Sequence, residues 1–224
     1  MNRIQQKHFD ASQGPVRKAE ERDLPRVVEI HQQAFQNFFL THLGRGFLQK
    51  YYEMALKYPA GVLLVSEAPS GVEGFVCGFV DPQGFYKLMS RSRLLFIWPI
   101  LWALIRHPSV VARVIYNIRR VDKERERTSA GSCELSSVAV RPDAAGRGVG
   151  KALLGAFLEQ AWSLGAHEVH LDTDASNNAS TNAFYQKAGF RLCREFEKYK
   201  GRSMNGYVIK RRMANEVTVD LESV

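Results

Sequence analysis

The stretch ELSSVAVRPDAAGRGVGKALL, residues 134–154, joins an alternating strand pattern to an apolar helical pattern. The turn between them holds Gly146, Gly148 and Gly150, with Arg147 among them. Glycine lets a backbone approach an anion without a Cβ in the way. The first turn of a helix leaves N–H groups free, and the helix dipole adds partial positive charge there. This order of strand, glycine turn and helix predicts a phosphate-binding turn.

Spacing separates this turn from two other phosphate-binding motifs. A Walker A loop ends in Lys-Ser/Thr, whereas Ala152 follows Lys151 here, so the magnesium-binding hydroxyl is missing. A dinucleotide fingerprint needs G-x-G-x-x-G, but Lys151 stands three residues after Gly148. The sequence therefore disfavours both an NTPase and a Rossmann-type dehydrogenase.

Length and composition describe a globular chain. Its 224 residues are enough for one sizeable domain or for a domain with an insertion. Apolar residues make up 45% and charged residues 24%, which is typical of a soluble fold. The net charge of +8 favours anionic partners, although a basic balance also serves plain solubility. The polar N-terminus lacks an apolar core of signal-peptide length, so we expect a cytoplasmic protein.

The three cysteines, Cys77, Cys133 and Cys193, are widely spaced. Without a CxxC or a Cys/His cluster, we expect no metal site. The strand-like surroundings of Cys133 and Cys193 predict buried, reduced thiols, in keeping with a reducing compartment.

Hydrophobic periodicity predicts strands and helices along the rest of the chain. A short strand and a helix are expected within 16–35, with Asp23 as the helix N-cap and Pro25 in its first turn. Further helices are expected over 44–58, 151–165 and 178–189, and further strands over 61–68, 74–82, 132–140, 167–174, 191–199 and 204–212. Residues 1–14 are expected to form a flexible arm, and 214–224 a C-terminal tail.

The glycine turn and a second block resemble the GNAT superfamily of acyl-CoA-dependent N-acyltransferases. The family's pyrophosphate loop, Q/R-x-x-G-x-G/A, matches at Gly148 and Gly150, while Ala145 stands at the family's Gln or Arg position. The block NASTNAFYQKAGF resembles the family's Asn-x-x-Ala-x-x-x-Tyr-x-x-x-Gly-Phe pattern, with Asn178 and Tyr185 in step.

The resemblance is strong over 131–212, moderate over 15–81 and absent over about 85–130. It implies an α/β (α+β) fold with a central mixed, mostly antiparallel sheet of six to seven strands. The fourth and fifth strands splay apart, and helices cover both faces. The segment 85–130 then becomes a helical apolar insertion between the third and fourth strands of a single domain spanning 15–213.

The same resemblance implies acetyl-CoA as co-substrate and direct transfer of its acetyl group to a primary amine, with no acyl-enzyme. In the family, the pantetheine arm lies between the fourth and fifth strands. The residues expected to bind the acetyl-CoA, including the loop that holds its pyrophosphate, are Val138, Ala139, Val140, Gly146, Arg147, Gly148, Val149, Gly150, Lys151, Asn178 and Tyr185. The backbone N–H of Val138 is expected near the thioester oxygen.

Two residues are expected to carry the proton transfers. Tyr185 occupies the family's general-acid position, where a phenol with a pKa near 10 can protonate the thiolate leaving group. A core packing role is the alternative. Glu134 stands where some family members have a glutamate that deprotonates the amine through water. The alternative is a carboxylate at a strand start, satisfied by a basic neighbour.

Other polar residues have weaker signals. Asp172 and Asp174 could bind the substrate's cationic amine or cap the helix that follows them. The histidines His31, His167 and His170 lack a partner pattern, which favours solvated or core positions over catalysis. The chain has no Gly-x-Ser-x-Gly elbow, which disfavours a serine nucleophile.

The insertion leaves the acceptor open. Segments 38–56 and 85–106 supply aromatic and basic side chains: Phe38, Phe39, Tyr51, Tyr52, Phe85, Tyr86, Arg91, Arg93, Phe96, Trp98, Trp102 and Arg106. One interpretation is a helical hairpin that caps the domain or a homodimer partner. The second is a pocket for a nucleotide- or lipid-linked amino sugar of polysaccharide biosynthesis. The third is a peripheral membrane contact through 94–118.

Two further alternatives concern the function itself. A protein amine, either an N-terminus or a lysine, is the second acceptor class. A non-catalytic acyl-CoA-binding module is the alternative to an enzyme. Nucleic acid is not expected as a partner, because no recognition helix, RNP-type strand or zinc pattern is present. The uncharged run of 12 residues from Leu94 to Ile105 is too short to span a bilayer.

Overall fold

The computed structural model describes residues 15–36, 38–92, 94–96, 131–198 and 201–211. The expected arm (1–14), the expected tail (214–224) and most of the expected insertion (97–130) lie outside these ranges.

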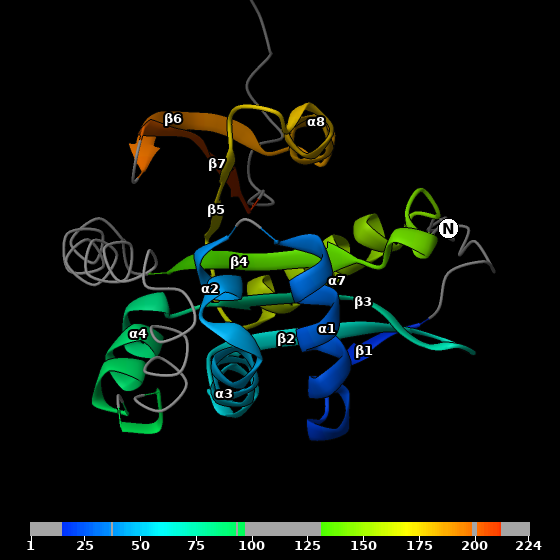
Figure 1. Ribbon diagram of the computed structural model, residues 1–224. Helices are drawn as coiled ribbons and strands as arrows, with labels where there is room; N and C mark the ends of the chain where they lie inside the picture. The colour runs from blue at the N-terminus through cyan, green and yellow to red at the C-terminus, as the bar shows by residue number, and fades with distance from the viewer. Residues whose placement is uncertain (1–14, 37, 93, 97–130, 199–200, 212–224) are drawn as a thin grey trace, which may run out of the picture.

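Seven strands form one sheet in the order β1-β2-β3-β4-β5-β7-β6 (Figure 1). Every neighbouring pair is antiparallel except β4 and β5, which run parallel. The strands are β1 (Val16–Lys18), β2 (Gly61–Ala68), β3 (Gly71–Phe79), β4 (Ser132–Val140), β5 (Glu168–Asp174), β6 (Arg191–Lys198) and β7 (Arg202–Lys210). The predicted mixed, mostly antiparallel sheet is confirmed.

The parallel pair β4 and β5 is joined only at one end. Its register runs through Ser132↔Glu168, Cys133↔Val169 and Glu134↔His170, and the remaining residues of both strands are unpaired with each other. Beyond Glu134 the two strands therefore diverge, as predicted. Figure 1 shows the result: β5, β7 and β6 rise away from the half of the sheet that holds β1 to β4.

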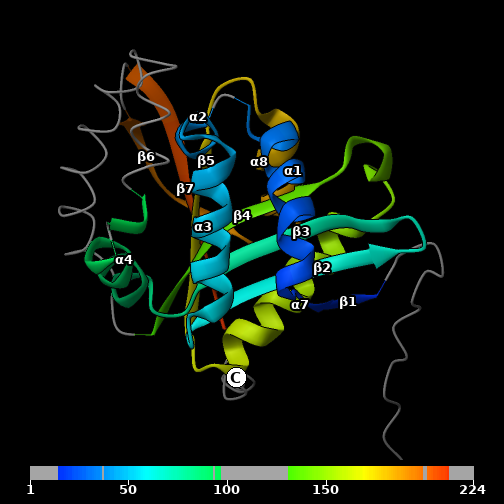
Figure 2. The ribbon, with the colours of Figure 1, turned by 60° about the horizontal axis from the view of Figure 1, so that its bottom comes forward.

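Helices cover both faces of the sheet (Figure 2). The first face carries α1 (Leu24–Ala34), α3 (Gly44–Lys57) and α4 (Pro82–Arg91), and the short α2 (Phe39–His42) precedes α3. The opposite face carries α7 (Val149–Ser163) and α8 (Ala179–Lys187). Each face has its own apolar core, which we call the α3 core and the α7 core. Leu48, Tyr52 and Phe75 belong to the α3 core, and Leu153 and Phe157 to the α7 core.

Two local predictions are wrong in detail. Strand β3 ends at Phe79, and the next helix begins at Pro82, because Asp81 accepts a hydrogen bond from the N–H of Gly84 (2.9 Å) as an N-cap. Asp23 precedes α1, but its carboxylate does not cap that helix. It accepts from the backbone N–H of Glu20 (2.8 Å) and from Arg17.

Four of the nine aromatic side chains expected at an acceptor surface are core residues. Tyr51, Tyr52, Phe85 and Phe96 are all buried in the α3 core. The rings of Phe79 and Phe85 stack with centroids 3.7 Å apart. These four residues are therefore not free to stack on a substrate ring, and that part of the prediction is wrong.

Little of the proposed membrane-contact segment 94–118 is described. Leu94 and Leu95 are exposed, while Phe96 packs on Phe47 with ring centroids 5.0 Å apart. Arg93, Trp98, Trp102 and Arg106 lie outside the described residues, as does the placement of any hairpin. Among the described helices, none has the length and hydropathy to cross a bilayer.

The cysteines divide between core and surface. Cys77 and Cys133 are buried, and burial raises the pKa of the Cys133 thiol to about 12. Cys193 is exposed on β6, so its predicted burial is wrong. Cys193 lies at the register shift between Leu192 and Arg194, on β6 at the edge of the sheet.

Candidate active site

The glycine turn has a backbone that requires glycine at two positions. Between the end of β4 at Val140 and the start of α7 at Val149, Gly146 has φ +77° and Gly148 has φ +83°. These left-handed values are strained for residues that carry a Cβ. The two glycines therefore fix how the chain leaves the strand and enters the helix.

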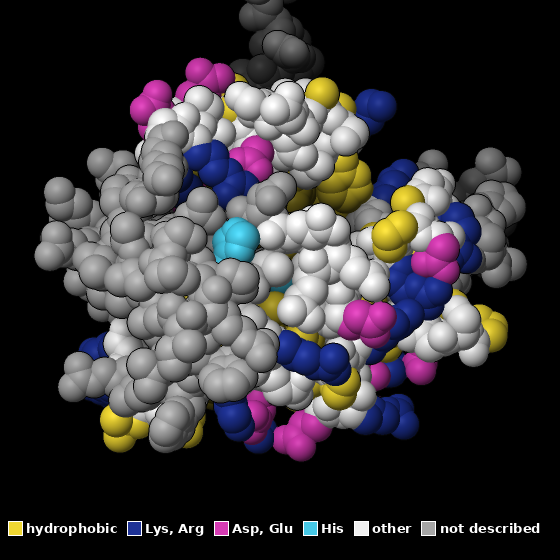
Figure 3. All heavy atoms as spheres, in the orientation of Figure 1, with side chains coloured by type: hydrophobic (Ala, Val, Ile, Leu, Met, Phe, Trp, Pro, Cys, Tyr) yellow, Lys and Arg dark blue, Asp and Glu magenta, His cyan; other side chains and the backbone are white. Residues whose placement is uncertain are grey.

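The N-terminus of α7 offers free hydrogen-bond donors. Gly148 is the N-cap residue and supplies no side-chain cap to the 15-residue helix. The N–H groups of the first turn, from Val149 to Lys151, have no intrahelical acceptor, and the helix dipole adds positive charge at this end. Lys and Arg side chains gather at the edge of the molecule where this turn lies (Figure 3). The free N–H donors and the positive charge at this end of α7 are features that favour binding of a diphosphate.

Gly150 brings three elements around one space. A Cβ built on Gly150 would meet Val140 Cγ2 at 3.7 Å and Phe184 Cζ at 3.8 Å, which are ordinary contact distances. The end of β4, the start of α7 and the helix α8 therefore converge beside the turn. Val138 and Val140 point into the α7 core, and Ala139 points to the α3 core. From Leu135 to Val140, β4 has β3 on one side and no strand partner on the β5 side.

A bulge in β4 lies beside the divergence. The register with β3 shifts between Cys77↔Ser137 and Gly78↔Leu135, which leaves Ser136 without an opposite residue. The Ser136 hydroxyl lies 2.8 Å from the hydroxyl of Tyr51 on α3. This bulge was not predicted, although the larger apolar residues change phase across it, from Cys133 and Leu135 to Val138 and Val140.

Glu134 lies at the point where β4 and β5 part, on the face of the α3 core. The hydroxyl of Tyr86 on α4 donates to its Oε1 at 2.8 Å. Burial and the neighbouring Glu134 carboxylate raise the pKa of Tyr86, so Tyr86 stays a donor. His170 is the register partner of Glu134, and Ser132 lies 3.0 Å from the Nδ1 of His170. The structure thus places a histidine expected to be without a role next to the predicted base.

Tyr185 lies on α8 in the α7 core, on the opposite face of the sheet from Glu134. Its ring lies among Phe184, Phe190 and Tyr207, with centroids 5.3, 5.7 and 6.1 Å away. Burial raises the pKa of Tyr185, which keeps the phenol protonated at neutral pH. Within the described chain its hydroxyl makes no hydrogen bond. Tyr185 therefore packs as a core aromatic yet keeps its donor uncommitted.

Comparison with known proteins identifies the family. The model of the Acetyltransferase (GNAT) family matches residues 24–190, about three quarters of the chain. The chain belongs to the GNAT acetyltransferase family. It is therefore an acyl-CoA-dependent N-acetyltransferase by class, as the glycine turn and the Tyr185 block predicted.

Solved structures have the same fold as this GNAT chain. The ribosomal-protein-alanine N-acetyltransferase of Brucella melitensis is 20% identical, with a TM-score of 0.58 over 88% of this chain and 99% of that one. The ribosomal-protein-S18-alanine N-acetyltransferase of Escherichia coli is 16% identical, with a TM-score of 0.56 over 92% and 98%. The yncA protein of Salmonella typhimurium, solved with its cofactor acetyl-CoA, is 17% identical, with a TM-score of 0.56 over 88% and 92%. The search of curated proteins found no match.

Asn178 organises the entry to α8 in this GNAT fold. Its side-chain amide donates to Thr173 Oγ1 at 2.8 Å and to the backbone oxygen of Asp174 at 3.1 Å. Asn182 donates to the same backbone oxygen at 2.9 Å. Asn178 thus fixes the link between β5 and the helix that carries Tyr185.

The two aspartates of β5 do not cap the helix that follows them. Asp172 pairs with Arg194 (2.9 Å) and Lys198 (3.4 Å), and Asp174 forms a two-pronged ion pair with Arg202. Neither caps α8, whose N-cap is Asn178 without a side-chain cap bond. Both carboxylates are already neutralised by β6 and β7, so they are poor binders of a cationic amine.

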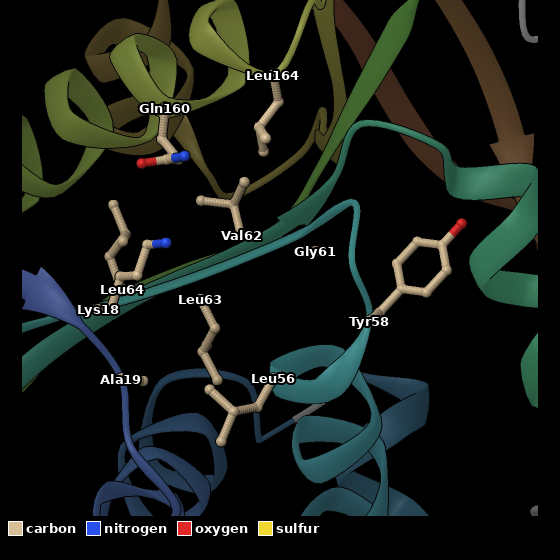
Figure 4. Close-up of a pocket in the computed structure, with 10 residues that line it drawn as sticks. All are labelled: Lys18, Ala19, Leu56, Tyr58, Gly61, Val62, Leu63, Leu64, Gln160 and Leu164. Carbon is tan, nitrogen blue, oxygen red and sulfur yellow. The ribbon is translucent and has the colours of Figure 1, made fainter.

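Two other features complete the description. Arg147 in the turn pairs with Glu73 of β3 at 3.0 Å, a partner that the sequence analysis did not single out. A shallow pocket lies at the other end of the sheet, between the ends of α3 and α7 (Figure 4). Its lining mixes apolar side chains with Lys18 and Gln160, and the Tyr58 hydroxyl points away from it toward α4. Among the described residues, no group of three or more His, Cys, Asp or Glu is placed to hold a metal ion.

Proposed function

We propose that this protein transfers the acetyl group of acetyl-CoA to a primary amine by direct attack, without an acyl-enzyme. The observation that carries the proposal is the divergence of β4 and β5 at Glu134, with the glycine turn at the far end of β4. A long acyl-CoA arm needs both an anchor for its diphosphate and an open strand edge along which to lie. This chain offers the two next to each other, because the open edge of β4 runs from Leu135 to Val140 and the glycine turn follows it.

The donor site would use the backbone more than side chains. The N–H groups of 146–151 would hold the diphosphate, and the open edge of β4 from Val138 to Val140 would pair with the amide-bearing arm. The N–H of Val138 would donate to the thioester oxygen as negative charge develops on it. Asn178 would meet the arm from the β5 side. Ala145 would not weaken the binding of the diphosphate, because the anion contacts come from backbone N–H groups and do not depend on the side chain of residue 145.

The acid and the base would act from opposite faces. Glu134 lies on the α3 face, where an amine could arrive, and would accept the proton of the ammonium through water. Tyr185 lies on the α7 face and would donate its proton to the departing thiolate. Cys77 and Cys133 are disfavoured as nucleophiles, since burial raises the pKa of both thiols and keeps them protonated.

For the acceptor we propose a polypeptide amine. Two structural neighbours are named for N-acetylation of a ribosomal-protein alanine, and this supports the peptide class. The amino-sugar alternative loses four of the aromatic side chains on which it depended, because Tyr51, Tyr52, Phe85 and Phe96 are core residues.

Two measurements test the proposal in order. Calorimetric titration with acetyl-CoA, with ATP and NAD as matched phosphate controls, tests the donor, and we expect binding of acetyl-CoA alone. Thiol release is then followed with an alanine-ended peptide, a peptide with a blocked N-terminus and an internal lysine, and a nucleotide-linked amino sugar. Turnover of the sugar without the peptides would refute the polypeptide acceptor, and no binding of acetyl-CoA would refute the enzyme.

A further inference from the structure

Glu73 is a carboxylate that this fold buries at the foot of the glycine turn. It lies on β3, and its side chain is 1% exposed. Two side chains hold it: the Ser66 hydroxyl donates to Oε1 at 3.2 Å, and Arg147 Nη2 donates to Oε2 at 3.0 Å. The adjacent Gly74 packs against α7, since a Cβ there would meet Val149 Cγ1 at 3.2 Å. Glu73 therefore lies close to the start of α7.

The position costs stability unless something offsets it. Removing a carboxylate from water is unfavourable, and a buried ion pair is often no more stabilising than apolar residues of the same volume. Its neighbours Val72, Phe75 and Val76 are buried apolar residues. An apolar residue would serve the core at position 73 equally well, so the charge calls for a role besides packing.

Glu73 contacts the turn at both ends. Its backbone oxygen accepts the N–H of Arg141, where β4 ends, at 2.8 Å. Its side chain holds Arg147, one residue before the N-cap Gly148. One residue of β3 thus brackets the whole turn from 141 to 147.

The bond to Glu73 uses one nitrogen of the Arg147 guanidinium. Among the described residues it is the only hydrogen bond of this side chain, which remains 43% exposed. A guanidinium carries five N–H donors in a rigid fork, so this partly exposed side chain, two residues before the start of α7, keeps donors for a further anionic partner. A free arginine on a turn would lose side-chain entropy on meeting an anion, whereas a tethered one has lost much of it in advance.

We propose that Glu73 is a positioning residue that fixes Arg147, and the turn with it, in the orientation that receives the diphosphate of the acyl-CoA. This inference rests on the proposed function, because it assumes that the turn binds acyl-CoA. Glu73 itself does not touch the donor and acts through Arg147.

The test is a double-mutant cycle of Glu73→Gln and Arg147→Ala, read by calorimetry with acetyl-CoA. Glu73→Gln should raise the Kd and the KM for acetyl-CoA about tenfold, the size of one charge-assisted hydrogen bond, and leave kcat within twofold. In the Arg147→Ala background the same change should raise Kd less than twofold further. Glu67→Gln is the matched control: this residue of β2 pairs with Arg17 of β1 and not with a residue of the turn, and its change should leave Kd unaltered.

Glu73→Asp guards against a folding defect. It keeps the buried charge, shortens the reach to Arg147 and should raise Kd in the same direction, with thermal melting recorded for every variant. An unchanged or tighter Kd in both Glu73 variants would overturn the inference, as would a full tenfold effect that persists without Arg147. Wild-type protein that binds no acetyl-CoA would instead overturn the proposed function and this inference together.

Discussion

Removal of one hydroxyl separates the chemical role of Tyr185 from its packing role. In Tyr185→Phe the ring keeps its contacts with Phe184, Phe190 and Tyr207. The hydroxyl has no partner in the described chain, so the free energy of unfolding should change by less than about 0.5 kcal/mol. Loss of a general acid should lower kcat about 10²- to 10⁴-fold. The Kd for acetyl-CoA should stay within about threefold, because only a contact near the sulfur is lost.

Tyr207→Phe is the matched control from the same aromatic cluster. Its hydroxyl donates to Asn182 Oδ1 at 2.9 Å, and that oxygen keeps a second donor from Asn205, also at 2.9 Å. Loss of the bond should lower stability by about 1 kcal/mol and leave kcat nearly unchanged. Tyr185→Phe should therefore change turnover and not stability, whereas Tyr207→Phe should change stability and not turnover.

The assay is thiol release at saturating acetyl-CoA, with urea unfolding of each variant under the same conditions. Because burial raises the pKa of Tyr185, the phenol stays protonated in mildly alkaline buffer. The wild type should thus keep its rate near pH 9. Turnover of Tyr185→Phe within about threefold of wild type would refute the acid role. An equal loss of turnover in both variants would show that the cluster acts through packing alone.

Three further predictions concern other parts of the molecule. Glu134→Gln keeps an acceptor for Tyr86 and should fold, but kcat/KM should fall about 10²-fold. The decrease of kcat/KM toward acidic pH, which protonation of the base causes in the wild type, should disappear in this variant. A pH profile that still decreases at acidic pH would exclude Glu134 as the base. Burial lowers the pKa of His31 from 6.5 to about 4, so the folded state binds fewer protons than the unfolded state. The stabilisation that comes from neutral His31 should therefore be fully present above pH 6.5. The free energy of unfolding should fall by up to about 3 kcal/mol as the pH drops to 4, and urea unfolding of His31→Phe should show no such loss. Gly148→Ala should cost about 1–2 kcal/mol at φ +83° and weaken acetyl-CoA, whereas Gly155→Ala, inside α7 with open space around it, should stabilise the protein by about 0.5–1 kcal/mol; equal melting temperatures would contradict this account.

The sequence predicted strands β4 and β5 well because buried and partly buried residues alternate along both of them. The alternation of β4 and β5, and the glycines around Arg147, are local signals of local structure. The parallel pairing of β4 with β5 and their divergence after Glu134 were predicted from the family resemblance, because no single residue indicates them.

Predictions about faces were weaker than predictions about elements. Tyr51 and Tyr52 follow one another on α3 and were expected at a substrate wall, yet both are buried, because the helix lies against a sheet and against α4 as well. Glu73 is the one charged residue in the apolar strand GVEGFVCGF. Its partner, Arg147, lies 74 residues further along the chain, so the sequence alone could not show what the charge does. Asp172 and Asp174 looked available in sequence, since their partners lie on strands further along the chain.

The arrangement of the site favours attack across the sheet over chemistry on one side of it. Glu134 is bonded from α4 on one face, and Tyr185 is packed under α8 on the other. An intact sheet would separate them, because its strands leave no space between neighbours for a substrate. The one interruption is the divergence of β4 from β5, which begins at Glu134 itself. An amine that arrives on the α3 face and a thiolate that leaves on the α7 face would therefore meet at this gap, with the proposed base and the proposed acid each on its own side.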